Sequence, residues 1–197
     1  MTTNVTKKTL ATKSPLPAVD ETLYQNGIHY FTGDFNVNST KPVIEWIIAS
    51  NLVPSHQRLK YLTLVINSVG GEVDSAFALI DVMKGSSIPI HTIGLGGIYS
   101  CGLLTFMAGE KGHRVVTPQT TIMSHRFSGG AYGKEHELFS RINSYEMTKD
   151  KIMNHYMKCT GLSESKVTKY LLPPEDVFLT AEEAVKRGLA DSVVSSY

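Results

Sequence analysis

The chain has 197 residues, 42% of them hydrophobic and 19% charged, which is typical of one globular domain with a sizeable core. A formal net charge of +1 argues against a strongly basic surface of the kind that binds nucleic acid or an anionic membrane. We therefore expect neither a nucleic-acid partner nor a membrane partner.

The cysteines and the N-terminal residues indicate the cellular compartment. Cys101 and Cys159 are the only cysteines, and they form neither a metal-ligand spacing nor a disulfide framework, which fits a reducing cytosol. No run of about 18 apolar residues predicts a membrane-spanning helix, and the N-terminal residues lack the apolar stretch of a signal peptide. The sequence predicts a cytoplasmic protein without a metal site.

Residues 1–18 differ in composition from the rest of the chain. They are rich in Thr, Lys and Pro, which predicts a flexible leader or a propeptide before one domain over residues 19–197. That domain begins with a predicted strand at 28–31, an amphipathic helix at 41–50 and a buried strand at 61–66. Apolar residues at helical spacing predict the next helix: Val73, Ala76, Phe77, Ile80 and Met83.

The second half of the domain continues the alternation of strands and helices. A strand is expected up to Thr92, a helix after Ser100, and further strands at 114–116, 121–123 and 189–194. Thr180 and Glu183 form a capping box, and Gly188 marks the end of the short helix that it begins. Strands that alternate with helices predict an α/β fold with a mostly parallel sheet.

The longest helical pattern covers residues 134–158. Its apolar residues fall on one stripe: Leu138, Ile142, Tyr145, Ile152 and Tyr156. The simplest interpretation of this stripe is a helix that packs against the core.

A serine at the start of a helix is the first candidate for catalysis. Ser100 follows an apolar strand at 88–93 and a glycine-rich turn at 94–97, and it precedes an apolar helix at 103–108. Unpaired backbone N–H groups and the helix dipole favour a developing negative charge at such a place. Because serine is also a common N-cap, Ser100 alone does not establish a nucleophile.

Two further residues supply the partners that a nucleophilic serine needs. Histidine changes charge near neutral pH, so His125 is suited to take the proton of Ser100 and pass it to the leaving amine. Asp176 is suited to orient the imidazole and to stabilise its charged form. Each also has a structural interpretation, as a hydrogen-bonded histidine and a helix-capping aspartate. The order Ser, His, Asp differs from that of α/β-hydrolases, chymotrypsins and subtilisins.

Backbone groups near these residues are candidates for binding an oxyanion and a peptide. The N–H groups of Gly71 and Cys101 are placed to stabilise the oxyanion, although a glycine pair also fits a close-packed turn. The segment after His125 fits an extended peptide that adds a strand, with a flexible hairpin as the alternative. The candidate substrate contacts are Gly70, Phe127, Ser128, Gly129 and Gly130. A small buried thiol is a commoner role for Cys101 than that of a second nucleophile.

Several motifs resemble those of the ClpP caseinolytic peptidases. Residues 66–71 are similar to I-N-S-P-G-G, residues 108–114 to A-G-A-K-G-K-R, and residues 122–125 to I-M-I-H. Residues 176–184 are similar to D-x-F-[ML]-[ST]-A-x-E-A. The resemblance covers about residues 61–194 and fades towards the N-terminus.

This resemblance implies a fold, an activity and an assembly. The fold is the ClpP/crotonase-like spiral of ββα units, with residues 134–158 as a handle helix that projects from the head and mates two rings. The activity is hydrolysis of unfolded polypeptides by a serine endopeptidase with the triad Ser100, His125 and Asp176. Two stacked seven-membered rings of the chain would receive substrates from a separate AAA+ ATPase. The sequence holds no G-x-x-x-x-G-K-[ST] motif, so we expect that partner alone to use ATP and this chain to need no cofactor.

Some positions depart from the family pattern. Tyr99 and Cys101 flank the serine where Ala and Met are usual, and Val69 replaces the usual Pro, so the S1 pocket and the loop stiffness are expected to differ. Arg126 replaces Gln, and Glu175 replaces an Arg that makes ring-to-ring ion pairs. Two alternatives stay open on the sequence, a crotonase-type acyl-CoA enzyme and a catalytically silent subunit that modulates an active ring.

Overall fold

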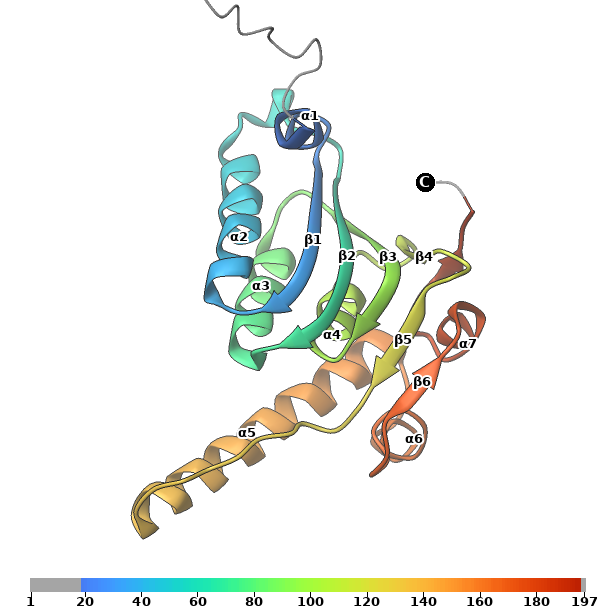
Figure 1. Cartoon of the computed structure of the whole chain (residues 1–197). Helices are drawn as coiled ribbons and strands as arrows, with labels where there is room; N and C mark the ends of the chain where they lie inside the picture. The colour runs from blue at the N-terminus through green and yellow to red at the C-terminus, as the bar shows by residue number, and fades with distance from the viewer. Residues whose placement is uncertain (1–18, 196–197) are drawn as a thin grey trace, which may run out of the picture.

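The computed structural model describes residues 19–195, which fold around one seven-stranded sheet (Figure 1). The parallel strands follow the order β1 (Ile28–Phe35), β2 (Leu62–Gly71), β3 (Ile90–Tyr99), β4 (Arg114–Val116) and β7 (Ser192–Val193). Off this path, β5 (Thr121–Ser124) pairs parallel with β3, and β6 (Val177–Leu179) pairs antiparallel with β5. The predicted α/β class with a mostly parallel sheet is confirmed.

Strand β3 has different neighbours along its two halves. Residues 92–94 pair with β4, whereas residues 97–99 pair with β5. Between the halves, Gly96 has a φ of 62°, in the left-handed region that favours glycine. Because the sheet divides at this point, the end of β3 and the end of β5 meet away from the main row of strands.

Three helices follow the first three strands and lie on one face of the sheet (Figure 1). They are α2 (Val37–Leu52), α3 (Val73–Gly85) and α4 (Cys101–Met107). Parallel strands that are joined in sequence by right-handed crossovers place their helices on the same face. Asn36 begins α2, since its side-chain oxygen accepts from the N–H groups of Asn38 (2.9 Å) and Ser39 (3.1 Å).

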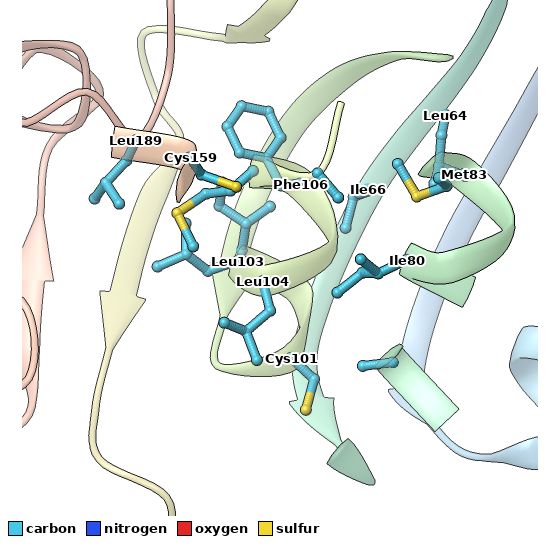
Figure 2. Packing of buried hydrophobic residues seen from close by; sticks show 14 of the residues in the cluster. Leu64, Ile66, Ile80, Met83, Cys101, Leu103, Leu104, Phe106, Cys159 and Leu189 are labelled. Atoms are coloured by element: carbon cyan, nitrogen blue, oxygen red, sulfur yellow. The ribbon is translucent and has the colours of Figure 1, made fainter. Parts of the chain in front are cut away.

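The core surrounds α4, in which all seven residues are buried. Ile80 and Met83 of α3 lie on one side of α4 (Figure 2). Cys159, which belongs to α5 (Glu135–Thr160), and Leu189, which follows α7 (Ala181–Lys186), lie on the other side. The N-terminus of α4 is therefore held by the hydrophobic core and not by a mobile loop.

Helix α5 packs against the core over only part of its length. Its 26 residues extend about 39 Å, and its buried residues lie in the C-terminal part: Ile152, Tyr156 and Cys159. The N-terminal half projects away from the rest of the molecule in Figure 1, and Phe139, Ile142 and Met147 are more than half exposed there. The predicted apolar stripe therefore packs against the core at Ile152 and Tyr156. The prediction that the whole stripe packs against the core is wrong for Ile142, which is exposed.

The other elements complete the domain. The capping box at Thr180 is present, because Thr180 Oγ1 accepts from the N–H of Glu183 (3.3 Å) and Glu183 Oε2 accepts from the N–H of Thr180 (3.0 Å). It begins α7 (Ala181–Lys186). The sequence did not predict α1 (Val19–Gln25), the 3₁₀ turn η1 (Ser55–Gln57), α6 (Glu164–Tyr170) or β6. The predicted leader, residues 1–18, lies outside the described residues.

A helix that crosses a bilayer needs about 20 predominantly apolar residues. Between residues 19 and 195, no helix combines the length and the apolar composition needed to cross a membrane.

Candidate active site

Ser100 lies at the junction of β3 and α4 in an unusual backbone conformation. Its φ is 53°, and among residues 19–195 it is the one non-glycine residue with a positive φ. Its N–H donates to the carbonyl of Met123 (3.0 Å), and its carbonyl accepts from the N–H of Leu104 (3.0 Å). Backbone strain of this kind persists where the surroundings impose it, and it is common at functional sites.

Two glycines of β2 make room for this turn. A Cβ atom on Gly70 would lie 2.7 Å from Ser100 Cβ, and a Cβ atom on Gly71 would overlap the backbone of Phe35. Their φ values of 102° and 143° also disfavour other residues. The close-packed turn between strand and helix, one of the two interpretations of this pair, is therefore present.

His125 reaches Ser100 from the end of β5. Its Nε2 lies 2.7 Å from Ser100 Oγ, within hydrogen-bond distance. The pairing of residues 97–99 with β5 explains this contact, because it places the residue after β3 beside the residue after β5. The side chain of His125 is 24% exposed, so a molecule in solvent can reach the pair.

Asp176 lies on the other side of the imidazole but farther away. Val177 pairs with Ser124 in the antiparallel register of β5 and β6, so the adjoining residues Asp176 and His125 face each other. The distance from Asp176 Oδ1 to His125 Nδ1 is 3.9 Å, beyond hydrogen-bond range, and the Asp176 side chain is 58% exposed. The structure thus gathers all three predicted residues, but only Ser100 and His125 are hydrogen-bonded. Glu175 beside them is exposed.

A buried hydrogen-bond network supports the strand that carries His125. Ser124 Oγ donates to the carbonyl of Leu171 (2.5 Å) and lies 2.7 Å from the hydroxyl of Tyr156, which is left as the donor. Burial raises the pKa of Tyr156, so its hydroxyl stays protonated. The sequence did not predict this network. The feature of the sequence that points to this network is Ser124, a serine in a strand at a position where the family motif has isoleucine.

The backbone groups proposed for the oxyanion line one small pocket with the serine. Gly71, Ser100, Cys101 and His125 all border this space of about 50 Å³. Cys101 is the first residue of α4, so its N–H has no acceptor within the helix. Its thiol donates to the carbonyl of Gly71 (3.2 Å), and burial raises its pKa. The thiol therefore stays protonated at neutral pH, as expected for a small buried side chain.

The segment after His125 lies open beside this pocket. Phe127 and Ser128 line the pocket, and within residues 19–195 no backbone–backbone hydrogen bond involves residues 127–130. Tyr145 of α5, a second contact that the sequence did not predict, donates its hydroxyl to the carbonyl of Gly130 (2.5 Å). Phe127 and Gly129 also line a cavity of about 490 Å³ bordered by α5 and α6. Apart from the Gly130 carbonyl, the backbone groups of residues 127–130 are therefore open to pairing with an extended peptide.

A metal ion in a protein is held by several ligand side chains that lie close together. Over the described range 19–195, no three His, Cys, Asp or Glu side chains are grouped closely enough to hold a metal ion.

Comparison with known proteins places the chain in a family. A family model described as Clp protease matches residues 17–197. This chain belongs to the Clp protease family. The ATP-dependent Clp protease proteolytic subunit of Deinococcus radiodurans is 33% identical over 143 residues, which cover 73% of this chain and 69% of that protein. The predicted family is confirmed, and it is a family of peptidases, which are hydrolases.

Proposed function

We propose that this chain is a serine endopeptidase, the proteolytic subunit of a Clp-type protease, with Ser100 as its nucleophile. The observation that carries this proposal is the contact of 2.7 Å between Ser100 Oγ and His125 Nε2 at the N-terminus of a buried helix. A serine hydroxyl is a weak nucleophile until a neighbouring base removes its proton. This pair has the separation that such a proton transfer requires.

Acylation follows from this geometry. Ser100 Oγ attacks the carbonyl carbon of the peptide while His125 Nε2 takes the hydroxyl proton, so a C–O bond forms and the carbonyl electrons move to oxygen. The N–H groups of Gly71 and Cys101 stabilise this oxyanion. When the C–N bond breaks, the leaving amine takes the proton from His125 and an acyl-enzyme remains. Water then repeats these steps on the ester and releases the acid.

Asp176 is the third member of the proposed triad. Its carboxylate would accept the Nδ1–H of His125 and thereby hold the tautomer that leaves Nε2 free to take a proton. The separation of 3.9 Å must shorten by about 1 Å to reach hydrogen-bond range. The exposed position of Asp176 just before the short strand β6 supports a small movement of this kind.

The substrate would bind as an extended polypeptide. Residues 127–130 would pair with its backbone, and Gly70 would allow close approach beside the serine. The absence of backbone pairing at residues 127–129 supports a preference for unfolded chains, since a folded substrate cannot offer a free strand.

The assembly and its surroundings form the second part of the proposal. We infer two stacked seven-membered rings, in which the exposed N-terminal half of α5 contacts the opposite ring, and a separate AAA+ ATPase that delivers substrates. The exposed apolar residues Phe139, Ile142 and Met147 support such a contact. The two free, buried thiols support a cytoplasmic location. We expect the chain to need no cofactor of its own.

The direct test compares the wild-type protein with Ser100→Ala on a short fluorogenic peptide. We expect kcat to fall by about 10⁶, because the triad residues act as a unit. Circular dichroism and native mass spectrometry would verify an unchanged fold and oligomer. Turnover of an acyl-CoA without peptide hydrolysis would favour the crotonase-type alternative, and a folded wild type without either activity would favour a silent ring subunit.

A further inference from the structure

A second cavity, of about 680 Å³, lies near the other end of α4. Met107, the last residue of α4, lines it together with side chains of α3 and of the C-terminal part of α5. Figure 2 shows Cys101 and Phe106 at opposite ends of α4, so the helix separates this cavity from Ser100. Seven residues of helix correspond to about 10 Å. The cavity is therefore a separate place from the candidate active site.

Four lysines line the cavity: Lys84 of α3, Lys111 of the turn after α4, and Lys151 and Lys158 of α5. In the part of the chain from 19 to 195, the ammonium groups of these four make no hydrogen bond or ion pair. Asp81 and Glu110 also line it, so four positive charges face two negative ones. The lining of this cavity therefore carries an excess of two positive charges, whereas the whole chain has a formal net charge of only +1.

Arg114 also borders the cavity but does not add to this excess. Its guanidinium donates to both carboxylate oxygens of Asp191, at 2.6 and 2.9 Å, and to the carbonyl of Cys159 at 3.1 Å. Burial acts to raise the pKa of Asp191, but the hydrogen bonds from Arg114 outweigh it and lower the pKa below its ordinary value. This closed ion pair fixes the end of α5, and the four lysines have no hydrogen-bond or ion-pair partner among residues 19–195.

The rest of the lining is apolar or neutral. Phe77 and Ile80 of α3 border the cavity, and the ring of Phe77 meets the ring of His155 edge-on at 6.0 Å. His155 Nε2 donates to the carbonyl of Leu104 (2.8 Å), and burial lowers the pKa of this histidine, so it is neutral at neutral pH. A volume of this size accommodates a small organic ligand. The cavity therefore combines several free ammonium groups with an apolar wall.

We propose that this cavity binds a small phosphate-bearing anion with two or more negative charges, held by the four lysines. Lysine ammonium groups bind phosphate oxygens as compact point charges with three donors each. The four lysines are exposed and come from three chain segments, so together they give this opening an excess of positive charge that a multiply charged anion would neutralise. This proposal is independent of peptide hydrolysis, because anion binding is measured without substrate. The anion site and the peptidase activity can therefore each be disproved without affecting the other.

The test uses isothermal titration calorimetry of the full chain with inorganic tripolyphosphate, and with adenosine triphosphate as a second probe. We expect saturable binding of tripolyphosphate that weakens as sodium chloride is raised from 50 to 200 mM, because salt screens the lysines. Tighter binding of adenosine triphosphate would assign a role to the apolar wall beside Phe77, whereas equal affinity would assign recognition to the phosphates alone.

A pair of double variants tests the location of binding. Lys84→Gln with Lys158→Gln removes one charge from each wall, and we expect affinity to fall at least about tenfold. Lys41→Gln with Lys169→Gln is the matched control, because it removes the same charge from α2 and α6, outside the cavity, and should leave affinity within about twofold. An equal loss in both double variants would overturn the proposal.

Lysine acetylation followed by peptide mapping supplies an independent readout. Bound tripolyphosphate should protect the four cavity lysines from acetylation and leave Lys41 unprotected. The proposal is overturned if the wild type shows no saturable binding. It is equally overturned if the cavity variants change the oligomer mass without changing anion binding, since the lysines would then face another copy of the chain.

Discussion

The two sides of His125 differ in how firmly they are built. On the Nε2 side, Ser100 lies 2.7 Å away and is held by β3, β5 and the buried helix α4. On the Nδ1 side, Asp176 lies 3.9 Å away on an exposed stretch before β6, a strand of three residues. Only Ser100, on the Nε2 side, is held in position by the hydrophobic core.

The difference indicates which part of the site a single chain positions by itself. The nucleophile and the base are placed by buried packing and by backbone hydrogen bonds of Ser100. The carboxylate depends on a short antiparallel pairing with β5, which has few buried contacts to hold it. We therefore expect a variant of the exposed Asp176 to lower catalysis with the fold unchanged, and variants of the buried residues that support Ser100 and His125 to lower stability.

Asp176→Asn gives the largest effect among the variants on this comparison. Asparagine keeps the shape but offers the wrong hydrogen-bond partner to His125, so we expect kcat on a fluorogenic peptide to fall by about 10⁴ with the fold unchanged. Full activity in Asp176→Asn together with an inactive Glu175→Gln would show that Glu175 is the carboxylate, and Asp176 would then lose its assigned role.

Ile152→Asp tests the buried packing that supports Ser100 on the Nε2 side of His125. Ile152 is buried and lines the pocket beside Ser100, so a charge there should lower the free energy of unfolding by about 3–5 kcal/mol. The control is Ile142→Asp, on the exposed half of the same helix, for which we expect a change within about 0.5 kcal/mol and a loss of oligomer mass. Urea unfolding and native mass spectrometry measure the two quantities, and similar destabilisation by both variants would contradict the division of α5.

Tyr156→Phe gives the smallest effect, because it removes a single hydroxyl from the network below His125. Ser124 would lose its donor in a buried place, which should cost about 1–2 kcal/mol of stability. Thermal unfolding measures this change, and Tyr170→Phe, at a half-exposed tyrosine, serves as the control. An unchanged stability would show that the contact between Ser124 and Tyr156 does not support β5.

The sequence was most informative where chemistry and local pattern coincide. A glycine turn before a buried helix pointed to Ser100, and the capping box pointed to α7, because both depend on residues close in the chain. The alternation of strands and helices predicted the parallel sheet for the same reason. The separation of 3.9 Å between His125 and Asp176 was beyond such reasoning, since it depends on how β6 pairs with a distant strand.

Tertiary packing also decided the features that sequence patterns left open. The stripe on α5 has one periodicity along its whole length, yet the buried residues of this helix lie only in its C-terminal part. Ser124, Tyr156 and Leu171 come from three separate segments, so no spacing in the chain predicts their hydrogen bonds. The four lysines of the second cavity are scattered in sequence in the same way.

The central claim is that His125 activates Ser100. Mass-spectrometric mapping of a fluorophosphonate adduct tests it most directly, because the reagent bonds covalently to an activated serine hydroxyl. We expect a single adduct on Ser100 in the wild-type protein and a far slower reaction in His125→Ala. An adduct on another serine, or no adduct in a protein that hydrolyses peptides, would contradict it.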